Sequence, residues 1–169
     1  MFYLLNNEIT FDIDLATVGC GLNAAIDFTS MPFDGGRIKY NFTGSQYGTG
    51  FCDGQDEPPN CHEMDIWEAN SLATMYTVHP CNKTSGKCNA YGCGLNNYPL
   101  GNKNFYGRGP NFAVDTSKPF SVVTRFITTD GTDNGDLKEI QQFYTQDGKI
   151  IESPMVNVFV FFFSLHVIF

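Results

Sequence analysis

Apolar and polar residues alternate one by one in several short stretches of this chain. The stretches are residues 9–15, 26–31, 120–127 and 140–145. Turn-forming Gly and Asp residues follow or separate them, at residues 34–36, 129–136 and 147–148. A period of two places neighbouring side chains on opposite faces of a strand, and no window follows the 3.6-residue period of an amphipathic helix. The pattern predicts an all-β antiparallel sandwich or barrel, with residues 26–36 forming a hairpin-like unit.

The net charge limits the classes of molecule that this chain is expected to bind. The 169 residues hold 10 Lys and Arg against 18 Asp and Glu, a net charge of −8 without a basic cluster. Nucleic-acid binding requires a concentrated positive face, so we expect no nucleic-acid partner. The length predicts a single domain with a core, and we expect a monomer.

The cysteines and sequons indicate an oxidising compartment. Six cysteines lie within the first 93 residues, at positions 20, 52, 61, 81, 88 and 93, and Asn41 and Asn82 begin glycosylation sequons. A zinc site of His79, Cys81, Cys88 and Cys93 is an alternative, but the spacing matches no zinc-ribbon pattern, so we predict no metal. The N-terminus has none of the features of a signal peptide, so we expect a secreted parent protein whose leader is missing from this chain.

The C-terminal segment differs from the rest of the chain. Twelve of the last fifteen residues are apolar and none is charged. The run is shorter than the roughly 18 to 25 apolar residues of a spanning helix, so we predict no membrane partner and treat an anchor as the alternative. We expect residues 1–153 to form the domain and residues 154–169 to lie outside it.

The densest chemistry lies in residues 61–70, where Glu63, Asp65 and Glu68 surround the only Trp of the chain. On a regular strand Glu63 and Asp65 share one face and Glu68 points to the other. A β-bulge between Asp65 and Glu68 would bring all three carboxylates onto one face, and bulges are common beside active sites.

Such a row of carboxylates suits a retaining glycosidase, which needs a nucleophile and an acid/base about 5 to 5.5 Å apart. Asp65 would hydrogen-bond the nucleophile. Adjacent carboxyl groups cannot all ionise at their ordinary pKa values, so the three groups would differ in protonation. A solvated acidic strand edge and a calcium site are the alternatives. Trp67 is either a sugar platform or a core aromatic.

Residues 63–70 resemble the E-x-D-x-x-E signature of glycoside hydrolase family 7, the cellobiohydrolases and endo-β-1,4-glucanases. Further matches lie at residues 11–14, 20–23, 47–53, 79–81, 100–102, 105–107 and 122–124. The resemblance covers residues 5 to about 153, the central part of the family's catalytic domain. It implies a concanavalin-like jelly-roll sandwich, incomplete at both ends, and therefore a fragment.

The resemblance also implies residue roles. Glu63 is the nucleophile, Asp65 its supporting carboxylate and Glu68 the acid/base in retaining hydrolysis of β-1,4-glucan such as cellulose, without a cofactor. Supporting residues near these carboxylates are Asp53 and His79, and candidate glucan contacts are Asn23, Tyr47, Gln55 and Trp67. Cys52 is expected to bond to Cys61 and Cys81 to Cys88, while the family partners of Cys20 and Cys93 lie beyond this chain.

The sequence also departs from the family. The Cys52–Cys61 and Cys81–Cys88 loops are short and Pro99 replaces an arginine of cellobiohydrolases, which favours an open cleft and endo-acting cleavage. Asp27 stands where the family has a tyrosine. The alternatives are a catalytically silent remnant, a glucan-binding β-sandwich, and an interaction protein with an acidic, calcium-loaded patch.

Overall fold

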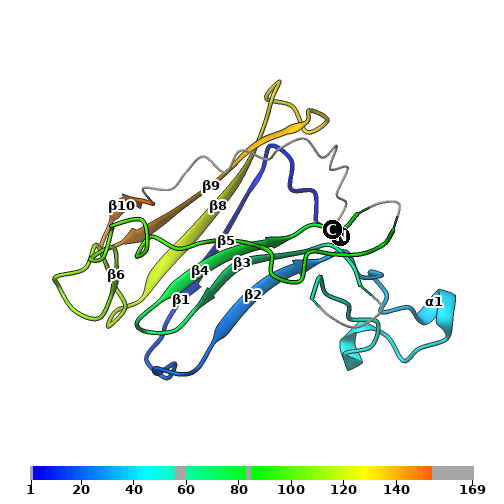
Figure 1. The fold of residues 1–169 in the computed structure, drawn as a ribbon, viewed down its shortest axis with the longest axis horizontal. Coiled ribbons are helices and arrows are strands. Elements are labelled where there is room, and N and C mark those ends of the chain that lie inside the picture. Colours follow the sequence, from blue (N-terminus) through cyan, green and yellow to red (C-terminus); the bar gives the residue numbers. More distant parts are fainter. Residues whose placement is uncertain (1, 56–59, 83–84, 154–169) are drawn as a thin grey trace.

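The computed structural model describes residues 2–55, 60–82 and 85–153, which form two antiparallel four-stranded sheets and a short parallel pair (Figure 1). One sheet has the order β1-β8-β9-β10, from β1 (Glu8–Ile13), β8 (Phe120–Thr128), β9 (Leu137–Gln146) and β10 (Lys149–Glu152). The other has the order β2-β3-β4-β5, from β2 (Ala24–Thr29), β3 (Glu63–Ala69), β4 (Thr74–His79) and β5 (Cys93–Leu95). The pair is β6 (Tyr106–Gly107) and β7 (Val114–Asp115). The predicted all-β sandwich is confirmed.

The alternating stretches form strands as predicted, namely β1, β2, β8 and β9. The turn between β9 and β10 contains Asp147 at φ 49° and Gly148 at φ 74°. Two consecutive residues with positive φ match the twist of flanking antiparallel strands, which explains why Asp-Gly joins a tight hairpin here.

The hairpin expected over residues 26–36 is wrong. β2 pairs with β3, more than thirty residues further along the chain, in the register Thr29↔Glu63 to Ala24↔Ala69. Gly36 has the left-handed conformation, but it precedes a short helix, α1 (Arg37–Tyr40), which is followed by the 3₁₀ turn η1 (Ser45–Tyr47). Glycines show that a chain turns and do not specify which strand follows.

The core lies between the two sheets and contains two apolar clusters. One cluster includes Trp67 of β3, Phe120 and Val122 of β8 and Tyr144 of β9. The other includes Ile66 of β3, Phe126 of β8 and Ile140 of β9. Burying each large apolar side chain contributes about 1.5 to 3 kcal/mol, so these contacts hold the inner face of β3 against the opposite sheet.

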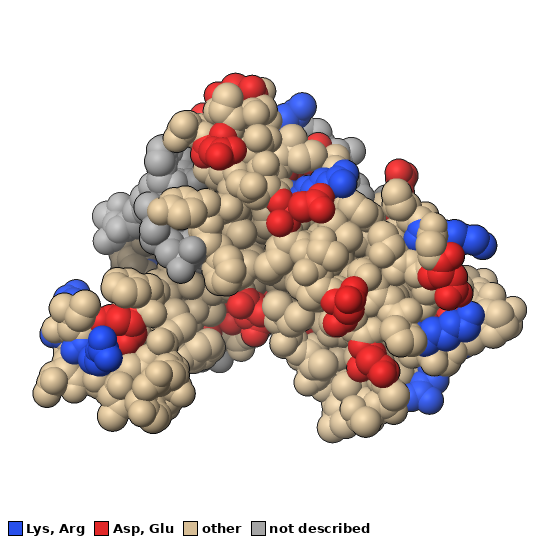
Figure 2. All heavy atoms as spheres, turned by 180° about the vertical axis from the view of Figure 1, so that it is seen from behind, with Lys and Arg blue, Asp and Glu red and all other residues tan. Residues whose placement is uncertain are grey.

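The surface is rich in acidic side chains. Figure 2 shows Asp and Glu residues distributed over one face, while Lys and Arg lie mainly toward its margins. Among the described residues, the structure contains no helix with the length and apolar character needed to cross a bilayer.

Candidate active site

The strand β3 carries a bulge at the position predicted from the sequence. On the β4 side, Asp65 pairs with Thr77 and Glu68 with Met75, so two residues of β3 lie opposite a single residue of β4. On the β2 side, the register is also shifted and Ile66 is left without a Cα partner. Ile66 is therefore the extra residue of β3.

The bulge sorts the side chains of β3 between the two faces. Met64, Ile66, Trp67 and Ala69 all belong to the core clusters, so Ile66 and Trp67 point inward consecutively. Thr77, the register partner of Asp65, donates its hydroxyl hydrogen to Oε2 of Glu68 at 3.5 Å. Glu68 therefore lies on the same outer face as Asp65, and the predicted row of three carboxylates is present.

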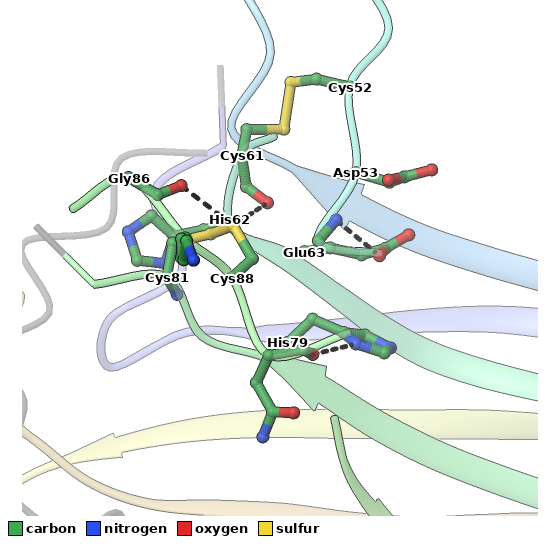
Figure 3. Close-up of a disulfide and its surroundings, with 12 residues drawn as sticks. Cys52, Asp53, Cys61, His62, Glu63, His79, Cys81, Gly86 and Cys88 are labelled. Carbon is green, nitrogen blue, oxygen red and sulfur yellow. Dashed lines mark hydrogen bonds between the residues drawn. A yellow bond between two sulfur atoms is a disulfide. The ribbon is translucent and has the colours of Figure 1, made fainter. Parts of the chain in front are cut away.

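Glu63 is held by the loop that precedes β3. The backbone N–H of Gly54 donates to Oε2 of Glu63 at 3.0 Å, and the Glu63 residue is only 5% exposed. The Cys52–Cys61 disulfide closes this loop, and Figure 3 shows Asp53 beside Glu63 below it. The carboxyl of Asp53 accepts the N–H of Gln55 at 3.0 Å, which stabilises the turn. The Gly54 N–H therefore fixes the position of the Glu63 carboxyl group.

Asp65 and His79 form a buried pair that shares a proton. Nδ1 of His79 lies 2.8 Å from the carbonyl oxygen of Asn89, and Nε2 lies 3.1 Å from Oδ2 of Asp65. A carbonyl only accepts, so Nδ1 carries a hydrogen. The hydrogen between Nε2 and Oδ2 then resides on either atom, giving an imidazolium with a carboxylate or a neutral imidazole with a carboxylic acid.

The electrostatics favour keeping that proton in the site. Burial raises the pKa of Asp65, and the charges of Glu63 and Glu68 raise it further. Burial lowers the pKa of His79, but the hydrogen bond to Asn89 and the charges of Asp65 and Glu63 outweigh it, so the net change is upward. Both groups thus hold a proton to higher pH than they would in water.

Two glycines allow the close packing around His79. A Cβ on Gly54 would clash with Cβ of His79, and a Cβ on Gly92 would lie 2.8 Å from Cε1 of its ring. Any larger side chain at either position would displace the imidazole. His79 thus lies beside Asp65, and its supporting role in the site stays a prediction.

Glu68 has a more open environment than the other two acids. The Nδ2 amide of Asn23 donates to its Oε1 at 3.1 Å, and Thr77 contacts its other oxygen. The residue is intermediate in burial, whereas Glu63 and Asp65 are buried. Asn23 thus lies beside Glu68, and its role as a glucan contact stays a prediction.

Asp27 is a fourth carboxylate on this face. It pairs in register with Asp65 across β2 and β3. Partial desolvation, with the charges of Glu63 and Glu68, raises the pKa of Asp27 to about 6. Sequence reasoning noted Asp27 only as a departure from the family, because the pairing of β2 with β3 cannot be seen in the chain order.

Ligand atoms of Glu63, Asp65 and His79 lie within 4.8 Å of one another, which is close enough to surround a cation. Glu63 already accepts the Gly54 N–H, and Asp65 and His79 are hydrogen-bonded to each other. These contacts account for the arrangement without a metal, and we identify no metal ligands among them.

The interpretation of Trp67 as a sugar platform is wrong. Trp67 is 1% exposed and packs edge-on against Phe120 with ring centroids 6.2 Å apart. The bulge turns its side chain into the core. Tyr47 of η1 is 69% exposed and Gln55 is also exposed. The roles of Tyr47 and Gln55 as glucan contacts remain predictions.

The disulfides agree with the expected pairs. Cys52 is bonded to Cys61 and Cys81 to Cys88, while Cys20 and Cys93 are exposed free thiols. The expected boundary at residue 153 is untested, because residues 154–169 lie outside the described residues.

Known proteins resemble this chain in both sequence and fold. The model of glycosyl hydrolase family 7 matches residues 1–60 and 56–162. A protein of Aspergillus terreus named probable endo-β-1,4-glucanase celB is 44% identical over 94% of this chain, and its namesake in Aspergillus clavatus is 42% identical. The chain spans about 43% of the length of these relatives.

Solved structures give the same result. A family 7 cellobiohydrolase from Daphnia pulex is 40% identical, with a TM-score of 0.81 over 93% of this chain and 46% of its own. The endocellulase EGI of Humicola insolens is 41% identical, with a TM-score of 0.79 over 89% of this chain and 44% of its own. The matched family model and the carboxylate row of β3 lead to one assignment: the chain belongs to glycosyl hydrolase family 7.

Proposed function

We propose that this chain carries the catalytic centre of a retaining β-1,4-glucanase, with Glu63 as nucleophile and Glu68 as acid/base. The observation that carries the proposal is the bulge of β3, which places both glutamates on one face with Asp65 between them. Retaining glycosidases require two carboxyl groups that flank the scissile bond, one as nucleophile and the other as acid/base.

The surroundings of the two glutamates suit these roles. Glu63 is buried and accepts a backbone N–H, which holds its carboxyl group in position for attack on the anomeric carbon. Glu68 is less buried, and its contacts with Asn23 and Thr77 orient its carboxyl group for proton transfer to the leaving oxygen. In the second step Glu68 removes a proton from water, and that water releases the sugar from Glu63.

The Asp65–His79 pair would support this cycle. Its shared proton places an uncharged or zwitterionic group between two glutamates, which reduces their mutual repulsion. Asp53, beside Glu63, and Asn23, bonded to Glu68, would fix the ends of the row.

We further infer that the glucan is cellulose or a related β-1,4-glucan, cut internally, and that the protein works outside the cell. The curated relatives are named as endo-β-1,4-glucanases, and one solved relative is an endoglucanase complexed with cellobiose. The nine-residue separation of Cys52 and Cys61 keeps the loop above Glu63 short, which suits an open cleft. The two disulfides suit an oxidising compartment.

Turnover of an aryl β-cellobioside by the full chain tests the proposal. Glu63→Gln and Glu68→Gln should each abolish turnover, while Glu152→Gln, on the exposed edge strand β10, should leave it unchanged. The first product should keep the β configuration, as followed by proton NMR. Circular dichroism should show that all three variants fold.

The outcomes separate the candidate functions. Wild-type rates in Glu63→Gln or Glu68→Gln, or an α-configured first product, would contradict the assigned roles. A folded wild-type chain that binds cellulose without turnover would instead support a catalytically silent glucan-binding sandwich.

A further inference from the structure

A single amide reaches across the core to the bulge. Gln142 lies on β9, in the sheet opposite the carboxylate row, and pairs in register with the fully buried Thr124 of β8. Its neighbours at alternate positions, Ile140 and Tyr144, belong to the two different apolar clusters. Gln142 is thus a polar residue placed where the two halves of the core meet.

The amide of Gln142 contacts the extra residue of β3. Its Nε2 donates to the carbonyl oxygen of Ile66 at 2.7 Å, and its Oε1 accepts the hydroxyl of Tyr144 at 3.3 Å. Ile66 is the residue of β3 that has no Cα partner on β2 or β4. A bulge interrupts the regular ladder and a buried carbonyl without a donor is costly, so a donor from the opposite sheet stabilises the carbonyl of Ile66 at this point.

We propose that Gln142 is a positioning residue for the acid/base: by bonding Ile66 it fixes the bulge that places Glu68 on the face of Glu63 and Asp65. Glu68 follows Ile66 by two residues, so the peptide orientation at Ile66 sets where the Glu68 side chain begins. Glu63 lies before the bulge and has its own donor in Gly54, so its position does not depend on Gln142.

The assignment to the acid/base rests on the proposed function, whereas the placement of Glu68 does not. Two readouts on the full chain therefore test it separately. The test variant is Gln142→Met, which keeps an unbranched side chain of similar length and removes the N–H. The matched control is Gln141→Met, because Gln141 is the next residue of β9, pairs with Arg125 and bonds Glu139 instead of the bulge.

The first readout is NMR of the side-chain carboxyl carbons. Gln142→Met should shift the Glu68 carboxyl resonance and its titration midpoint while leaving those of Glu63 in place, and Gln141→Met should shift neither. If Gln142→Met does not fold, Gln142→Asn, whose amide is one methylene too short to reach Ile66, provides the same comparison. Equal shifts at Glu63 and Glu68, or none at Glu68, would overturn the proposal.

The second readout is turnover of aryl cellobiosides with poor and good leaving groups. A misplaced acid matters only when the leaving group needs a proton, so Gln142→Met should lower kcat about tenfold or more on the poor substrate and change it little on the good one, with KM unchanged. Equal losses on both substrates would contradict a role through Glu68. A wild-type chain without turnover would overturn the proposed function, while the NMR comparison would still decide the role of Gln142.

Discussion

Replacing Asp27 with Asn should stabilise the protein at neutral pH and leave it unchanged in acid. Asp27 pairs with Asp65 on the acidic face, and its pKa in the fold is about 6 against an ordinary value of 3.8. A carboxyl whose pKa is raised by folding destabilises the native state once it ionises. The penalty is absent below pH 3.8, grows between pH 3.8 and about 6, and is complete above that value.

The size of the effect follows from the pKa and from solvent exposure. The difference between 3.8 and about 6 corresponds to about 3 kcal/mol for a fully buried group. Asp27 is exposed, and screening by water reduces such effects severalfold, so we expect a gain of about 1 kcal/mol for Asp27→Asn at pH 8. At pH 4 the carboxyl of the folded wild type is protonated and resembles the amide in size and charge, so only a small part of the difference should remain.

Urea unfolding at pH 4 and pH 8, followed by circular dichroism, measures both values. Asp136→Asn is the matched control, because Asp136 is an exposed residue in the loop between β8 and β9, away from the carboxylate row. The difference in free energy of unfolding between Asp136→Asn and wild type should be about the same at pH 4 and pH 8. An Asp27→Asn gain that is equal at pH 4 and pH 8, or that Asp136→Asn reproduces, would refute the reasoning.

Two further predictions concern the elements that hold the glutamates. Ile66→Ala should lower the free energy of unfolding by about 2 to 5 kcal/mol because Ile66 is fully buried, whereas Ile150→Ala, at 69% exposure, should change it by less than about 0.5 kcal/mol. Similar urea midpoints for the two variants would count against the core assignment. Replacing Cys52 and Cys61 together by Ser should cost about 3 kcal/mol because the loop between them is freed, and should also expose the Gly54 N–H that bonds Glu63 to faster hydrogen exchange. Unchanged exchange at Gly54 would contradict the role given to this disulfide.

Local patterns in the sequence were sufficient for the strands and for the carboxylate row. The alternation at residues 120–127 predicted β8, and the spacing of Glu63, Asp65 and Glu68 called for a bulge that the structure contains. These features depend on the two-residue period of a strand, which can be recognised from residues that are adjacent in the sequence.

Features that depend on contacts between distant segments could not be predicted in this way. The hairpin expected at residues 26–36 failed because β2 pairs with a strand beyond a long connection. Trp67 was left open as a sugar platform or a core aromatic, and the bulge, which turns its side chain inward, decides for the core. Gln142 has no distinctive motif, and only the packing of the two sheets brings it to Ile66.

The hydrogen bond between Asp65 and His79 has a consequence for how the site responds to charge. Moving one proton between Nε2 and Oδ2 creates or removes a dipole beside Glu63 while the net charge of the pair stays the same. Over the pH range in which the pair holds this proton, the local field can change without exchange of a proton with solvent. The pair can therefore respond to the charge of Glu63 by moving its own proton.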